Sequence, residues 1–302
     1  MIDRPVFIAG LDRTGKTPMR IAIESSASIA MARRSELWTQ HNARHGDLAD
    51  DTLASQAVAE LLRDRHVAGQ VHDATRLERE LLAGPRTYAH LFALIGRQHA
   101  EQAGRERWGD QTALIERHAS EILDAYPDAR FVHMIRDPRD RFATALAAGG
   151  IGRGGPSAAS EAWLESAQLG ERHAAAHPDR YLLVRFEDLA AEARPTLDRV
   201  LAFIGERTLT TGAPIPVSAE LAAGVGVHQD VLPPRAVALI ESRCGPMMLR
   251  HGYVPDAPAL GPVDRLRLAL LDRPLAEATL IARRARAGRT RRATRASRAG
   301  GV

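Results

Sequence analysis

Three short apolar runs stand out in the chain, and each is followed by a polar turn and then by a helical pattern. They lie at residues 6–9, 129–135 and 181–186. Runs of this length bounded by turn residues are typical of buried strands, whereas apolar residues spaced three or four apart indicate helices. Strands that alternate with helices favour a parallel sheet with helices on both faces. The pattern therefore predicts an α/β fold built on a central parallel sheet.

Two other segments have a helical pattern without a strand before it. Residues 47–103 repeat apolar positions at helical spacing and predict a helical insertion. Residues 263–287 combine leucine with arginine and predict a C-terminal helix that leads into a basic tail. We therefore expect one main domain, residues 1–258, followed by a helix and an arginine-rich tail at residues 259–302.

The net charge of +4 changes this picture little, because most of the basic excess lies at the C-terminus. Residues 278–302 hold eight arginines and no acidic residue, so the rest of the chain is acidic overall. An acidic body is not typical of nucleic-acid-binding domains, and we expect no nucleic-acid partner. The basic segment 263–298 is a candidate for weak contact with a membrane surface. The pattern leaves the oligomeric state open.

The N-terminus does not resemble a targeting segment. Residues 1–5 lead directly into the first predicted strand, and no apolar run approaches the roughly 18 residues of a membrane span. We therefore expect a cytoplasmic protein that does not cross a membrane.

Residues 10–17 match the phosphate-loop pattern G-x-x-x-x-G-K-T and lie between the first predicted strand and helix. Glycines let backbone amides face an anion, and the helix N-terminus adds its dipole. Lys16 is the only lysine among 41 basic residues, which indicates a position that requires a compact ammonium group. The loop alone fits an ATP-dependent kinase or NTPase as well, with Asp137 as the candidate magnesium ligand at a strand end.

Three separated segments, residues 10–17, 126–144 and 184–205, together resemble the family of sulfotransferases that use 3′-phosphoadenosine 5′-phosphosulfate (PAPS). The resemblance implies a fold like that of phosphate-loop NTPases. It also implies transfer of a sulfuryl group from PAPS to a hydroxyl acceptor (a carbohydrate, a lipid or a small metabolite), with PAP as the product and no metal. The insertion 47–103 would lie on the acceptor side.

The same resemblance assigns the PAPS-binding residues. An arginine and, eight positions later, a serine hold the 3′-phosphate in the family, and Arg136 and Thr144 occupy these positions. Phe186 stands where the family usually has a tyrosine near the nucleotide. The loop that binds the 5′-phosphosulfate is similar to Arg13, Thr14, Gly15, Lys16 and Thr17.

For catalysis, Arg13 and Lys16 are the expected cations on the reacting group. Glu36 follows the first helix at about the distance at which several family members place a catalytic glutamate, and it is the expected base. Other residues that could serve as the base are His41, His45, His72 and Asp110.

Gln111 is a departure from the family, because members often have a lysine in its place. Lys16, which replaces a threonine of the usual loop, could supply the missing charge. Two alternatives to an active sulfotransferase therefore remain, a phosphate-loop kinase and a non-catalytic homologue that binds PAP.

Overall fold

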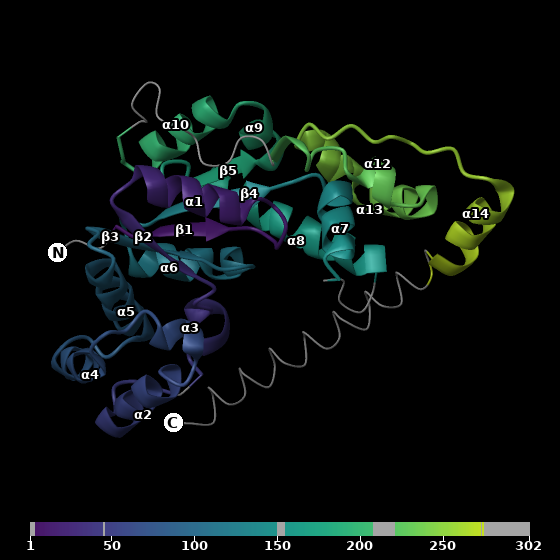
Figure 1. The fold of residues 1–302 in the computed structure, drawn as a ribbon. Coiled ribbons are helices and arrows are strands. Elements are labelled where there is room, and N and C mark those ends of the chain that lie inside the picture. Colours follow the sequence, from purple (N-terminus) through teal and green to yellow (C-terminus); the bar gives the residue numbers. More distant parts are fainter. Residues whose placement is uncertain (1–3, 45, 150–154, 208–220, 273, 275–302) are drawn as a thin grey trace. The chain divides into compact units, whose positions relative to one another are not determined.

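The computed structural model describes residues 4–44, 46–149, 155–207, 221–272 and 274 (Figure 1). The chain divides into two compact units. The first comprises Met1–Arg136 and Ser166–Val225, and the second comprises Asp137–Glu165 and Gly226–Val302. Each unit is described by itself below.

The first unit is built on a five-stranded sheet in the order β2-β3-β1-β4-β5. All neighbouring strands are parallel, with Phe7 opposite Asp110 on one side and Phe131 on the other. This arrangement confirms the predicted parallel sheet. The strands are β1 (Val6–Ala9), β2 (Ile29–Arg33), β3 (Arg107–Gln111), β4 (Arg130–Ile135) and β5 (Tyr181–Arg185).

Side chains that alternate along the strands form separate apolar cores on the two faces of the sheet. Phe7, Phe131 and Tyr181 belong to one core, together with residues of the insertion helices. Val6 and Ile8 belong to the other, together with residues of three helices that cover the opposite face. These three are α1 (Lys16–Ser26), α9 (Phe186–Ala191) and α10 (Ala193–Phe203). Both faces of the sheet are therefore buried, which explains why β1 is apolar at every position.

The predicted insertion is helical. Each of its four helices begins with a side-chain cap, in which Asp50, Asp64, Asp73 and Thr87 accept hydrogen bonds from backbone amides in the first turn. Its helices are α2 (Asp51–Leu61), α3 (Arg65–Ala68), α4 (Ala74–Ala83) and α5 (Tyr88–Gln102). The short helix α6 (Ala119–Ala125) contributes to the same core.

Two of the five strands, β2 and β3, were not predicted from the sequence. The last predicted strand also extends to Phe186, which instead begins α9, since the strand ends at Arg185. Strand β3 carries Arg107, Asp110 and Gln111, and these polar side chains are all buried. Their polarity removes the apolar signal by which the other strands were recognised.

The second unit is helical in its described part. Trp163 is buried beside the rings of His251 and Tyr253, with ring centroids 6.3 and 6.4 Å away. Its helices are α7 (Pro138–Ala147), the first part of α8 (Gly155–Ala176), α12 (His228–Val231), α13 (Pro234–Arg250) and α14 (Pro262–Arg267).

The described part of the predicted C-terminal helix consists of α14 and the π-helical turn Leu268–Asp272 that follows it, and residues 275–287 of that prediction lie outside the described residues. The arginine-rich tail lies outside the described residues, so its proposed membrane contact stays a prediction. Within the described part of the chain, no helix combines the length and the apolar character needed to cross a bilayer.

Candidate active site

The loop between β1 and α1 depends on two glycines. Gly10 and Gly15 have φ angles of 109° and 91°, in the left-handed region that favours glycine. A Cβ atom on Gly10 would lie 2.2 Å from the carbonyl oxygen of Met134, and one on Gly15 would lie 2.6 Å from the ring of Phe186. The loop backbone therefore packs against β4 and against the start of α9.

Lys16 folds back over this loop. Its side chain is only 4% exposed, and Nζ donates a hydrogen bond to the carbonyl oxygen of Gly10 at 2.8 Å. The Asp12 carboxylate lies 3.6 Å from the same nitrogen. Burial lowers the pKa of Lys16, although Asp12 and Glu116 act in the opposite direction. The loop thus holds a buried amine whose charged form Asp12 and Glu116 stabilise against the cost of burial.

Arg136 connects the loop to Phe186. The guanidinium donates hydrogen bonds to the carbonyl oxygens of Arg13, at 2.9 Å, and Gly224, at 2.5 Å. It also lies 4.3 Å from the centroid of the Phe186 ring, at cation–π distance. The structure therefore brings together Arg13, Arg136 and Phe186, three of the residues to which the sequence analysis assigned PAPS binding.

The three threonines of that assignment differ in their surroundings. Thr14 is buried and its hydroxyl donates to the carbonyl oxygen of Leu11 at 2.7 Å, which stabilises the loop. Thr17 is exposed in the first turn of α1. Thr144 is half-buried on α7, in the second unit, and its part in the site stays a prediction.

A cavity of about 380 Å³ opens beside Lys16 in the first unit, and Glu36 and Gln111 also line it. Glu36 is half-buried and has a left-handed φ of 54°, just before the π-helical turn η1 (Leu37–His41). No other described residue forms a hydrogen bond or ion pair with its carboxylate. One cavity is thus lined by Lys16, the proposed cation, by Glu36, the proposed base, and by Gln111, which departs from the family.

A family model described as the sulfotransferase family matches residues 5–209 of the chain. The chain belongs to the sulfotransferase family. The expectation from the three sequence segments is thereby confirmed at the level of the family.

Solved structures of sulfotransferases resemble the fold. The sulfotransferase domain from the curacin biosynthetic pathway is 14% identical, with a TM-score of 0.52 over 84% of this chain and 99% of that one. The domain from the olefin synthase of Synechococcus PCC 7002 is 17% identical, covers 93% and 96% of the two chains and has a TM-score of 0.49. A sulfotransferase from Alicyclobacillus acidocaldarius is 15% identical, with 83% and 97% covered and a TM-score of 0.44. No curated protein gives a match.

In this sulfotransferase a buried carboxylate anchors the phosphate loop. This carboxylate was not recognised from the sequence. Glu116 is fully buried in the short 3₁₀ turn η2 (Ile115–His118), and its Oε2 accepts a hydrogen bond from the backbone amide of Gly10 at 3.1 Å. Ser166 donates to Oε1 at 2.5 Å and lies 3.1 Å from Nε2 of His133. Only the position of Glu116 between the apolar Ile115 and a helix could have drawn attention to it, because its partner is 106 residues away.

A second buried carboxylate holds the turn that presents Glu36. Asp110 accepts hydrogen bonds from the hydroxyls of Ser35, at 2.6 Å, and Thr112, at 3.1 Å. The Ser35 oxygen in turn accepts from the amide of Leu37 at 3.3 Å. Asp110 does not line the cavity, so its geometry fits a positioning role better than that of the base.

Burial raises the pKa of Asp110 to about 6, from the ordinary 3.8. The folded protein therefore binds this proton more strongly than the unfolded chain, and stability should fall as pH rises from about 4 to 6. Relative to wild type, the variant Asp110→Asn is expected to gain about 3 kcal/mol in the free energy of unfolding over this interval. Urea unfolding between pH 4 and 8 measures it, with the exposed Asp128→Asn as control. Identical pH profiles for wild type and Asp110→Asn would contradict the prediction.

The other candidate bases lie away from the cavity or outside the described residues. His41 is buried with Nε2 3.3 Å from the Asp64 carboxylate, and His72 lies 4.0 Å from Glu101 beside the insertion helices. His45 lies outside the described residues. His118, which the sequence analysis did not single out, does line the cavity. Glu36 is therefore the candidate that the geometry supports best.

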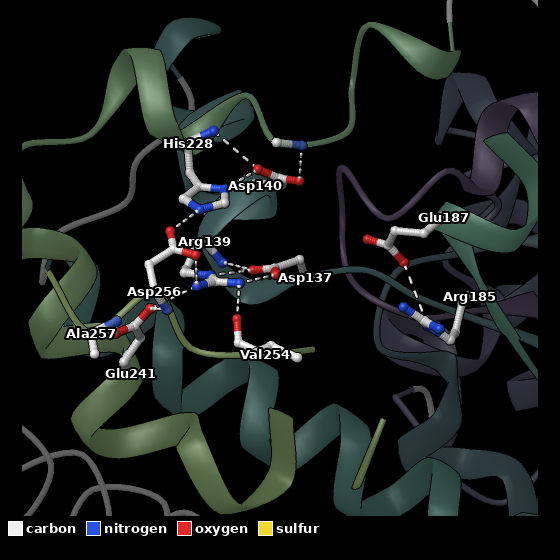
Figure 2. A network of polar contacts seen from close by, with 11 residues as sticks. Asp137, Arg139, Asp140, Arg185, Glu187, His228, Glu241, Val254, Asp256 and Ala257 are labelled. Carbon is white, nitrogen blue, oxygen red and sulfur yellow. Dashed lines mark hydrogen bonds and ion pairs between the residues drawn. The ribbon is translucent and has the colours of Figure 1, made fainter. Parts of the chain in front are cut away.

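The second unit shows why Asp137 is a poor magnesium ligand (Figure 2). Its carboxylate caps α7 by accepting from the amide of Arg139 at 2.8 Å, and it pairs with the guanidinium of the same residue at 2.7 Å. Arg139 also pairs with Glu241 and Asp256 and donates to the carbonyl oxygen of Val254. Within the described ranges no group of three or more potential ligands is placed to hold a metal ion.

A histidine beside this cluster is held by two carboxylates. His228 lies 2.5 Å from Asp140 through Nδ1 and 2.8 Å from Asp256 through Nε2 (Figure 2). Burial opposes its charge, but these two hydrogen bonds raise the pKa of His228. Asp140 also accepts from the backbone amides of Gly226 and His228, at 2.8 and 3.0 Å. These bonds fix α12 to α7.

Proposed function

We propose that the chain transfers a sulfuryl group from PAPS to a hydroxyl group of its acceptor. One observation carries the proposal, namely that Lys16 and Glu36 line the same cavity beside the phosphate loop. Transfer to a hydroxyl requires a cation where negative charge develops and a base that accepts the hydroxyl proton. PAPS supplies the sulfuryl group when it is bound, and PAP is the product.

The residues of the loop fit an anionic donor. Burial lowers the pKa of Lys16 despite the attraction of Asp12 and Glu116, so an anionic ligand beside it would stabilise the ammonium form. Backbone amides and hydroxyls from Arg13 to Thr17 would bind the 5′-phosphosulfate. Arg136 would bind the 3′-phosphate, and Phe186 would stack beside the adenine.

On the acceptor side, Glu36 would take the proton of the attacking hydroxyl. No ion pair with another described residue competes for its carboxylate, and Glu36 lies half-buried at the cavity wall, where a bound acceptor can reach it. Asp110 and Ser35 would keep the turn before η1 in place through the bonds described above. Lys16 would take over the charge that a lysine in place of Gln111 supplies in many family members.

The replacement Arg136→Ala tests the donor half of the proposal. Loss of a charge-assisted contact to a phosphate is expected to weaken PAP binding roughly tenfold to a hundredfold, and Arg136 also holds the carbonyl of Arg13. Calorimetric titration with PAP, without magnesium, measures the effect. Arg199→Ala is the matched control, because this arginine is 51% exposed and lies on α10.

The same titrations separate the alternatives. A kinase would bind ATP only with magnesium and would not respond to PAP, which would refute the proposal. If the protein binds PAP tightly but does not convert PAPS to PAP with any hydroxyl acceptor, it is a non-catalytic homologue. Unchanged PAP affinity in Arg136→Ala would remove Arg136 from the site.

A further inference from the structure

Most of the residues that line the cavity beside Lys16 have polar or charged side chains. Sites that bind small molecules are mostly lined by apolar and aromatic side chains. Among the described residues of this wall, Ala113 and Leu114 are the apolar ones, and the one aromatic ring is the polar imidazole of His118. A ligand with several hydroxyl groups would find partners on most sides.

The side-chain oxygen of Gln111, on the wall of this cavity, is a hydrogen-bond acceptor without a donor among the described residues. Its side chain is 5% exposed, and its buried Oε1 forms no hydrogen bond with any described residue. Buried carbonyl oxygens are almost always hydrogen-bonded, so this atom requires a donor such as a hydroxyl group. The amide that replaces a lysine of the family is thus suited to bind a hydroxyl.

Arg34 and Arg117 add positive charge to the same wall. The backbone amide of Arg34 donates to the carbonyl oxygen of Gln111 at 3.0 Å, which fixes the position of the residue. The Arg34 guanidinium has no ion pair or hydrogen bond within the part of the chain that the structure describes, yet its charge contributes to lowering the pKa of Lys16. Guanidinium groups bind carboxylate, phosphate and sulfate in fixed geometry.

Backbone strain is concentrated around this cavity. Among the described residues, six that are not glycine have a positive φ, and Arg34, Glu36 and Leu114 on the cavity wall are three of them. A fourth, Arg13, lies in the adjacent phosphate loop. Such conformations cost free energy and persist where the surrounding structure enforces them, frequently at functional sites. The strain supports a role for these side chains beyond folding.

We infer that the acceptor is a small hydroxylated molecule that carries an anionic group, which Arg34 and Arg117 bind while Glu36 faces the reacting hydroxyl. The inference rests on the proposed function for the reaction itself. In that reaction the acceptor oxygen forms a bond to sulfur as the bond between sulfur and the bridging phosphate oxygen breaks. The hydroxyl proton passes to Glu36, and PAP leaves with the bonding electron pair. Arg34 thereby determines which acceptor is used.

Matched pairs of acceptors that differ only in the anionic group test this inference. The first set is glucose, glucuronate and glucose 6-phosphate, and the second is benzyl alcohol and 4-(hydroxymethyl)benzoate. Calorimetry with PAP-saturated wild type is expected to show at least roughly tenfold tighter binding of the anionic members. In Arg34→Gln this preference should fall to within about twofold, whereas Arg33→Gln should keep it. Arg33 is the neighbouring exposed arginine and does not line the cavity.

Each outcome decides the inference. A preference for the carboxylate over the phosphate, or the reverse, identifies the anion that the two arginines bind and supports it. Equal affinity for neutral and anionic members, no binding in either set, or an unchanged preference in Arg34→Gln would overturn it. Weaker PAP binding in Arg34→Gln would assign Arg34 to the donor and also overturn it. Failure of wild type to bind PAP would contradict the proposed function instead, and the same titrations without PAP would still test the anion site.

Discussion

Replacement of Lys16 by methionine is expected to lower kcat for sulfuryl transfer by roughly a hundredfold to a thousandfold. The side chain is of similar length and is buried, so the variant should fold, but the ammonium held 2.8 Å from the carbonyl oxygen of Gly10 is lost. PAP formation from PAPS, with an acceptor that the wild type uses, measures the effect. If Lys16→Met keeps kcat within about threefold of the wild-type value, Lys16 has no part in the mechanism.

Lys16→Arg is the control for charge alone. The guanidinium is larger and forked, and the position is only 4% exposed, so we expect this variant to recover little of the lost activity. The pH profile adds an independent measurement. Because burial lowers the pKa of Lys16, its ammonium should lose its proton below the ordinary 10.5, and kcat should decline on the alkaline side of the profile before that pH. Full recovery in Lys16→Arg would mean that any cation suffices.

Replacement of Arg139 by methionine is expected to lower the free energy of unfolding of the second unit by about 3–5 kcal/mol. The arginine is 4% exposed and pairs with Asp137, Glu241 and Asp256, so its removal leaves carboxylates without their cation. Urea unfolding followed by circular dichroism measures the loss.

Arg267→Met on α14 is the matched control for Arg139→Met. Arg267 is exposed, and the change should alter stability by less than about 0.5 kcal/mol. A loss of less than about 1 kcal/mol in Arg139→Met would indicate that water or rearranged side chains compensate the carboxylates.

The fold could be predicted where the signal is local. Strand β1, the loop after it and Lys16 were recognised because an apolar run, two glycines and a lysine lie within a dozen residues. Strand β3 could not be recognised in the same way, because the partners of the buried Arg107 are distant in sequence. They are Glu206, 99 residues away, and the carbonyl oxygens of Arg4 and Ile204. Pairing over such distances has no counterpart in a short window of sequence.

The residues of the candidate site were likewise predicted only where the sequence around them carries a recognisable pattern. The resemblance to the family pointed to Glu36 and Gln111, and the structure places both at one cavity with Lys16. Arg34, Arg117 and His118 were missed, since one arginine among 41 basic residues, or one histidine among twelve, carries no signal until its surroundings are known. Glu116 was missed for the same reason as β3, because its partner Gly10 lies 106 residues away in the chain.

The loop that buries Lys16 has a consequence for amine chemistry. Because the chain has no second lysine, its surface presents arginine but no lysine amine to acetyl groups, aldehydes or isopeptide-forming enzymes. The one lysine amine is 4% exposed in the phosphate loop and has a lowered pKa. An acylating reagent that reaches it would therefore report on the opening of this loop at the one lysine side chain.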